Sequence, residues 1–176
     1  GGYAYDYSPL HAWVSESFAG FGDAYCCGPR GFSSSTYALD LTNPTEWLKL
    51  PDFPGTPRQG HKCVTADNAL YCWGGMSYTP SKEVNTRLPK SKNYTHSYVD
   101  GNKLSFDGKR WKWTPLPPLP SQQGCFTDIC YSAQENAFFL VGGASYNLSM
   151  ILTQNGKNTY KFDLTTMKWM EMPALP

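Results

Sequence analysis

The sequence is poor in charge and has no long apolar stretch. Charged residues make up 16% of the 176 residues, below the roughly 25% of an average domain. The formal net charge of +1 implies no general attraction to nucleic acid or to membranes. No apolar run approaches the length of about 18 residues that a membrane-spanning helix requires. Glycine and proline, at 16 and 14 residues, are too frequent for long helices.

Short motifs that identify many enzymes are also absent. There is no GxSxG, no phosphate-binding glycine loop and no kinase or protease signature. The three histidines have no HExxH or other paired spacing, and no CxxC with nearby histidine suggests a metal site. These histidines are His11, His61 and His96. We therefore expect no catalytic residues, no cofactor and no metal.

The six cysteines indicate an oxidising compartment, because an even count in a chain low in lysine and glutamate is typical of disulfide-bonded proteins. They are Cys26, Cys27, Cys63, Cys72, Cys125 and Cys130. Candidate N-glycosylation sites at Asn93 and Asn147 point the same way. The chain begins at Gly1, so we expect a processed or partial chain, in which a missing signal peptide says nothing about secretion. We predict an extracellular protein, with a cytoplasmic one as the alternative.

A tryptophan-centred segment occurs three times, as WLKLPDFP, WTPLPPLP and WMEMPALP. Its tryptophans are Trp47, Trp113 and Trp169. An aspartate precedes each tryptophan by six or seven residues, namely Asp40, Asp107 and Asp163. Because they recur in register, the tryptophans are expected to pack in the core. The aspartates are expected to hold turns by hydrogen bonds rather than to form a catalytic pair.

Two further segments, ALYCWGG (69–75) and AFFLVGG (137–143), each follow an apolar run across a turn. They predict β-hairpins with tips at 67–68 and 135–136. The closing glycines are Gly74, Gly75, Gly142 and Gly143, and they suit backbone with positive φ or a close approach to a neighbour. One unit is thus a hairpin, a glycine pair, a strand with aspartate, a strand with tryptophan and a proline-rich exit.

The hairpin pattern also predicts cysteine pairing. A two-residue turn at Asp67-Asn68 sets Cys63 directly opposite Cys72, where a disulfide fits; two buried free thiols are the alternative. The same alignment places Tyr131 opposite Leu140 in the next unit. Two further expectations are left open: Cys125 and Cys130 bridge each other or pair elsewhere, and Cys26 and Cys27 find different partners.

Four short strands about every 50 residues are typical of a β-propeller blade. The glycine pairs, the Tyr-x-[Phe/Leu]-Asp strand and the following tryptophan resemble the kelch repeat over roughly residues 37–176. Arg58 followed by Gly60-His61 resembles the start of a kelch blade, where the third unit instead has Gln123-Gly124. The resemblance implies an all-β fold with kelch-like propeller blades of four antiparallel strands.

We predict one partial propeller domain over 1–176. It divides into one or more irregular N-terminal blades (1–57), a blade with a basic insertion at 76–103 (58–116) and a further blade (117–176). About three and a half units are fewer than the roughly 4–8 blades of closed propellers. An open stack exposes strand edges that favour association. We therefore expect either part of a longer chain or a half that closes with another polypeptide.

Residues 81–112 contain eight basic and three acidic residues, a local charge of +5. In kelch proteins, loops between the second and third strands often bind partners, so the resemblance implies a docking loop for an acidic protein or glycan. A solvated, partly glycosylated loop is the alternative. The candidate residues are Lys82, Arg87, Lys90, Lys92, Tyr94, His96, Tyr98, Lys109 and Arg110.

The leading functional hypothesis is a non-enzymatic binding or assembly scaffold in a secreted or surface protein, whose partners are other protein chains. One alternative is a fragment of an extracellular kelch-containing enzyme such as a copper radical oxidase, although no matching tyrosine, histidine and cysteine motif is present. Another is an intracellular kelch adaptor, in which the cysteines are reduced.

Overall fold

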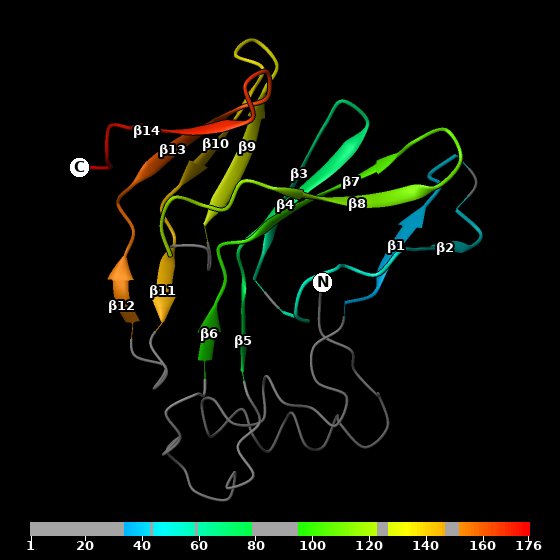
Figure 1. The fold of residues 1–176 in the computed structure, drawn as a ribbon, viewed down its shortest axis with the longest axis horizontal. Coiled ribbons are helices and arrows are strands. Elements are labelled where there is room, and N and C mark those ends of the chain that lie inside the picture. Colours follow the sequence, from blue (N-terminus) through cyan, green and yellow to red (C-terminus); the bar gives the residue numbers. More distant parts are fainter. Residues whose placement is uncertain (1–33, 43, 59, 79–94, 123–126, 147–151) are drawn as a thin grey trace, which may run out of the picture.

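The computed structural model describes residues 34–42, 44–58, 60–78, 95–122, 127–146 and 152–176. These residues form fourteen strands and no helix, so the predicted all-β fold is confirmed (Figure 1). A membrane-spanning helix is accordingly not found in the described part of the chain. The expectation for the N-terminal segment falls largely on residues 1–33, outside the described residues.

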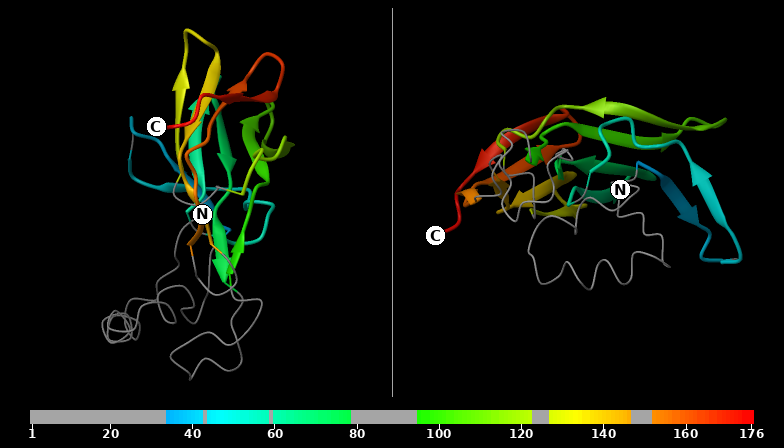
Figure 2. Two further views of the ribbon diagram at one scale, coloured as in Figure 1. Left: turned by 90° about the vertical axis from the view of Figure 1, so that its left-hand side faces the viewer. Right: turned by 90° about the horizontal axis from the view of Figure 1, so that it is seen from below.

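Two four-stranded antiparallel sheets, here called the first and second blades, dominate the structure. The first blade has the order β3 (Lys62–Ala66), β4 (Ala69–Trp73), β7 (Gly101–Phe106) and β8 (Trp111–Leu116). The second has the order β9 (Asp128–Ser132), β10 (Ala137–Val141), β13 (Thr159–Asp163) and β14 (Lys168–Met172). Ahead of both lies a two-stranded sheet of β1 (Thr36–Leu39) and β2 (Trp47–Leu50). Figure 2 shows the three units following one another.

Each blade carries a two-stranded ribbon between its second and third strands. The ribbons are formed by β5 (Met76–Tyr78) with β6 (Thr95–Ser97), and by β11 (Ala144–Tyr146) with β12 (Leu152–Asn155). Strands β6 and β11 are in contact, so the two ribbons lie side by side (Figure 1). The sequence indicated only the first insertion, as a loop. The four glycines at the ribbon entrances have φ between 67° and 107°, as predicted.

The two hairpins differ in their turns. Asp67 and Asn68 have φ of 49° and 55° and form the expected two-residue turn, with Cys63 opposite Cys72. In the second blade the pairing closes at Ser132 and Ala137, so the loop has four residues. The prediction that Tyr131 faces Leu140 is therefore wrong: the longer loop shifts the register by two residues, and Tyr131 faces Phe138.

The core lies between the blades. Tyr71 and Trp73 of β4 are buried against Phe138 and Phe162 of the second blade. Ring centroids lie 4.8 Å apart for Tyr71 and Phe138, and 5.1 Å apart for Trp73 and Phe162, both in edge-on contact. Gly101 lies against the Trp73 indole and leaves no room for a Cβ. The first strands of the two blades, β3 and β9, are also in contact. Aromatic packing thus joins blade to blade.

Candidate functional site

The repeated aspartates form turns, as predicted. In each case Oδ1 accepts a hydrogen bond from the backbone N–H two residues later, at Thr42, Lys109 and Thr165, over 2.8, 3.0 and 2.9 Å. These hydrogen bonds favour the ionised carboxylate, and they lower the pKa of Asp107 and of Asp163 below the usual value. The aspartates are therefore structural.

The proline-rich exits of the three units are equivalent in detail. In each exit, the residue before the last proline donates a 2.8 Å hydrogen bond from its backbone N–H. The acceptor is the backbone carbonyl of the residue that lies two positions before the third strand of the same unit. The pairs are Phe53 with Ser34, Leu119 with Val99, and Leu175 with Lys157. The sequence repeat is thus also a structural repeat, including the first unit, where only β1 and β2 are described.

The recurrent tryptophan joins each blade to the exit of the unit before it. The Trp113 indole N–H donates to the carbonyl of Pro51 over 2.9 Å. The Trp169 indole N–H donates to the carbonyl of Pro117 over 3.4 Å, and Trp73 donates to the same carbonyl over 3.0 Å. Pro51 and Pro117 each follow their own tryptophan by four residues. Sequence reasoning missed this contact, although the Trp-x-x-x-Pro spacing was its signal.

Trp47 departs from the prediction of core packing, because 66% of it is exposed. Trp113 and Trp169 are half-buried against Phe53 and Trp73, at 5.3 Å between ring centroids in both cases. Each of them packs against a preceding exit, and the described residues include no exit ahead of Trp47. Among the described residues, Trp47 is therefore exposed because no preceding exit packs against its indole.

The next blade packs against one face of the blade before it. Residues that are paired directly across neighbouring strands form rows on this face. In the first blade one such row is Val64, Tyr71, Lys103 and Thr114. The corresponding row of the second blade, here called the open row, is Cys130, Phe139, Lys161 and Met170. In both rows the lysine lies over the aromatic ring, with its Nζ 5.1 Å from the ring centroid in the first blade and 5.9 Å in the second.

These two equivalent rows differ in what covers them. Tyr71 of the first row is buried beneath Phe138 of the second blade. In the open row Met170 is 47% exposed and Cys130 is exposed with a free thiol. Among the described residues, the second blade thus leaves open the surface that the first blade uses to hold its neighbour.

Arg58 lies at the bend where β4 ends and is only 2% exposed. Its Nη1 and Nη2 donate to the two carboxylate oxygens of Asp100 over 2.6 and 3.0 Å, and Nη1 also donates to the carbonyl of Gly74 over 3.1 Å. The guanidinium carbon lies 3.8 Å from the ring centroid of Tyr98. A buried charge needs such complete pairing, so Arg58 fixes the entrance to the β5–β6 ribbon.

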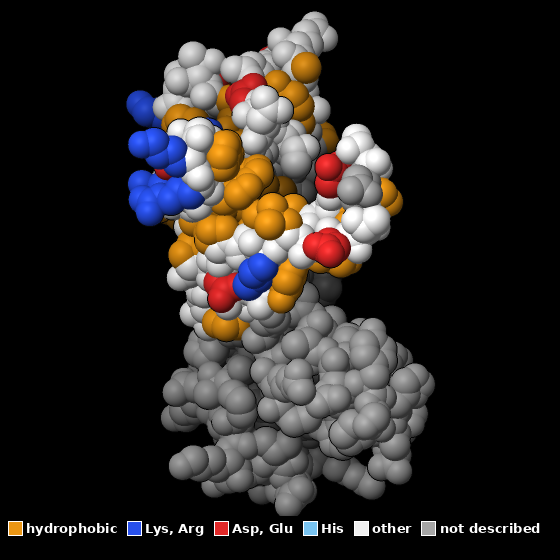
Figure 3. Space-filling model, turned by 90° about the vertical axis from the view of Figure 1, so that its right-hand side faces the viewer, with side chains coloured by type: hydrophobic (Ala, Val, Ile, Leu, Met, Phe, Trp, Pro, Cys, Tyr) orange, Lys and Arg blue, Asp and Glu red, His pale blue; other side chains and the backbone are white. Residues whose placement is uncertain are grey.

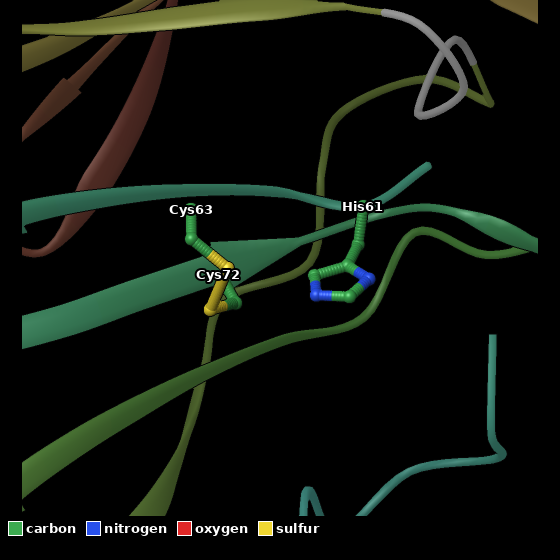
Figure 4. A group of neighbouring side chains, drawn as sticks. All are labelled: His61, Cys63 and Cys72. Atoms are coloured by element: carbon green, nitrogen blue, oxygen red, sulfur yellow. A yellow bond between two sulfur atoms is a disulfide. The ribbon is translucent and has the colours of Figure 1, made fainter. Parts of the chain in front are cut away.

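Cys63 and Cys72 form the predicted disulfide between β3 and β4. His61 lies beside it, with a ring nitrogen on the side of the sulfurs (Figure 4). Burial, which penalises the charged form, lowers the pKa of His61 from 6.5 to about 4, and the positive charge of Arg58 acts in the same direction. Donor atoms of these three residues lie within 4.8 Å of one another. We did not predict this cluster. The signal for it in the sequence is a His-x-Cys segment that lies opposite a second cysteine in the hairpin.

The predicted basic loop is divided by the fold. Lys109 and Arg110 are exposed at the β7–β8 turn, at the opposite end of β7 from the β5–β6 ribbon (Figure 1). Figure 3 shows the side of the molecule toward this turn, with Lys and Arg side chains gathered at one edge. Tyr98 packs on the guanidinium of Arg58. His96 lies in β6, and the other candidates fall outside the described residues: Lys82, Arg87, Lys90, Lys92 and Tyr94.

Five predicted sites lie outside the described residues, namely Cys26, Cys27, Cys125, Asn93 and Asn147.

A groove of about 370 Å³ lies between the first exit and the first blade, lined by residues that include Pro54, Pro115 and Pro118. Its charged lining residue, Asp100, is engaged by Arg58, so we assign no chemistry to the groove.

Comparisons with known proteins show which fold the chain shares with a solved structure. No protein-family model and no curated protein matches the chain. Among solved structures, the chain is similar to the structure of YjhT, with a TM-score of 0.59 and 18% identity. The match covers 89% of this chain and 48% of YjhT, so the chain spans about half the length of that protein. YjhT is a β-propeller-type structure, and the two blades accordingly have the architecture of part of a β-propeller.

Proposed function

We propose that the chain is a segment of a kelch-type propeller and acts as a non-enzymatic scaffold that assembles with other protein chains. The observation that carries this proposal is the open row of the second blade. Its counterpart in the first blade is covered by an aromatic face from the next blade, and the open row offers the same ring-and-lysine arrangement. The partner is therefore a further blade that presents aromatic side chains and a tryptophan N–H.

The exit after β14 supports the same partner. Pro173 follows Trp169 by four residues, as Pro51 and Pro117 follow their own tryptophans. The carbonyls of those two prolines accept the indole N–H of the next unit. The carbonyl of Pro173 is thus the expected acceptor for the tryptophan of an incoming blade.

An extracellular location forms part of the proposal. Cys63 and Cys72 are disulfide-bonded, and such bonds persist mainly in oxidising compartments. The basic side chains at the β7–β8 turn would favour acidic protein or glycan ligands, and attraction of this kind weakens with salt.

Sedimentation velocity over a range of concentrations tests the proposal. We expect the chain to form species heavier than its 19.7 kDa mass, and Met170→Glu to shift it toward the monomer by placing a charge in the open row. Lys109→Glu, at the β7–β8 turn, is the control and should associate like the wild type. A dispersed 19.7 kDa monomer at every concentration would contradict assembly through the open row.

A further inference from the structure

The disulfide and His61 form a cluster that the scaffold function does not use. His61 precedes Cys63 by two residues, and side chains two apart lie on the same face of a strand. Cys63 is directly opposite Cys72 in the β3–β4 ladder. One imidazole and two sulfurs thus converge from two adjacent strands, with their ligand atoms within 4.8 Å of one another.

The three ligand atoms lie close enough together to surround a tetrahedral zinc ion once the disulfide is opened. Bond lengths of about 2.3 Å to sulfur and 2.0–2.1 Å to nitrogen place neighbouring ligand atoms roughly 3.5–3.8 Å apart. Once the S–S bond is cleaved, the two sulfurs move apart from bonding distance toward this separation by side-chain rotation. The imidazole already lies beside them (Figure 4).

We propose that, when a dithiol reduces the Cys63–Cys72 disulfide, His61, Cys63 and Cys72 bind a zinc ion. Two electrons from the dithiol convert the disulfide into two thiols, and the dithiol becomes a cyclic disulfide. Zinc then replaces the two thiol protons, which are released to solvent. The fourth ligand is water.

The residues around the cluster suit a doubly charged zinc ion with three protein ligands and one water. Two thiolates balance the 2+ charge of zinc, so the loaded cluster adds no net charge to a half-buried place. Cys72 is buried while Cys63 is exposed, which leaves a route for the ion and for the water ligand. The nearby positive charge of Arg58 is paired with Asp100. Three protein ligands with two sulfurs and one nitrogen are an established zinc set.

The second blade provides a matched comparison, because it has the same geometry without the ligands. Lys62 pairs with Trp73 just as Asp128 pairs with Val141, and both Trp73 and Val141 precede a glycine pair. The equivalents of His61, Cys63 and Cys72 are therefore Thr127, Ile129 and Leu140. Placing these residue types at positions 61, 63 and 72 introduces side chains that the second blade already holds at the equivalent positions.

In the experiment, the full chain is first reduced with a phosphine, which has no thiol that could itself bind the metal. Co²⁺, a spectroscopic probe for zinc, is then titrated into the reduced chain, and Zn²⁺ is added in competition. The variants are His61→Thr and the double variant Cys63→Ile/Cys72→Leu, which sets the background from the other four cysteines. Far-UV circular dichroism checks that each reduced variant is folded. Absorption bands of tetrahedral Co²⁺ with thiolate ligands report the site.

We expect the reduced wild type to bind one equivalent more than the double variant, and the oxidised chain to show no thiolate bands beyond the background of the double variant, since Cys130 has a free thiol. Groups that merely orient a metal ligand are worth about 10–100-fold in affinity, so loss of the ligand in His61→Thr should weaken binding at least about tenfold. Equal binding by the wild type and the double variant would overturn the proposal. So would unchanged affinity in His61→Thr, a comparison that keeps both thiols and remains decisive if the double variant does not fold.

Discussion

Arg58 shows how one side chain holds the irregular part of a blade. Its guanidinium bridges Asp100, ahead of β7, and the carbonyl of Gly74, at the end of β4. These groups flank the β5–β6 ribbon on both sides. The fork geometry of arginine allows simultaneous pairing with a carboxylate and a carbonyl, which the single ammonium of lysine does not reproduce.

Arg58→Lys should therefore destabilise the chain although it keeps the charge. We expect a loss of about 2 kcal/mol in the free energy of unfolding, the range for hydrogen bonds to charged groups. The loss stays below the value for a fully buried pair, since the Asp100 side chain is 46% exposed. Urea unfolding measures it, with Arg110→Lys at the exposed turn as a control expected to change stability by less than about 0.5 kcal/mol. Equal stability of the two variants would show that Arg58 is not an anchor.

His61 should make stability depend on pH in the oxidised protein. Its pKa in the folded state is about 4, against 6.5 for the ordinary side chain. The unfolded chain therefore binds the proton more readily, and stability is full above pH 6.5 and falls as the pH drops toward 4. Unfolding measured across this range should show a steeper decline for the wild type than for His61→Thr. A histidine resonance of His61 that titrates near pH 6.5 in the folded protein would contradict the assignment.

At the scale of elements, the outer strands β8 and β14 dock on the exit of the unit before them. Part of this could be predicted from the sequence: the tryptophan repeat, the turn aspartates and the Cys63–Cys72 pairing all follow from local spacing. The inter-blade hydrogen bonds could not, because local pattern does not reveal which distant carbonyl faces an indole. The register of β9 and β10 was missed because two turn lengths fit the same sequence.

Trp169→Phe tests this docking, because it removes the indole N–H while keeping an aromatic ring. The carbonyl of Pro117 would lose one of two donors, and we expect destabilisation of about 1 kcal/mol, the net value of a typical hydrogen bond, plus a contribution from lost packing. Trp47→Phe is the control, because that side chain is exposed and its loss should have little effect. Thermal unfolding compares the two variants. Similar losses in both would argue against a special role for Trp169.

At the scale of the whole molecule, equivalent units are joined by a contact that repeats from one to the next. The sequence predicted blades and their order, but not which face of the second blade remains open, since that depends on the packing between sheets. The β11–β12 ribbon was missed because its residues gave no strand pattern distinct from a loop. Assembly through the open row follows from the repeated geometry rather than from any single motif.

Hydrogen exchange of the tryptophan indole N–H groups, followed by NMR, tests most directly the claim that each blade docks on the exit before it. We expect Trp113 and Trp169 to exchange many times more slowly than a free indole, because their indole N–H groups are hydrogen-bonded to the carbonyls of Pro51 and Pro117. If both exchange at the rate of a free indole in the folded chain, the repeated contact between blades does not exist, and the case for the open row as an assembly surface fails with it.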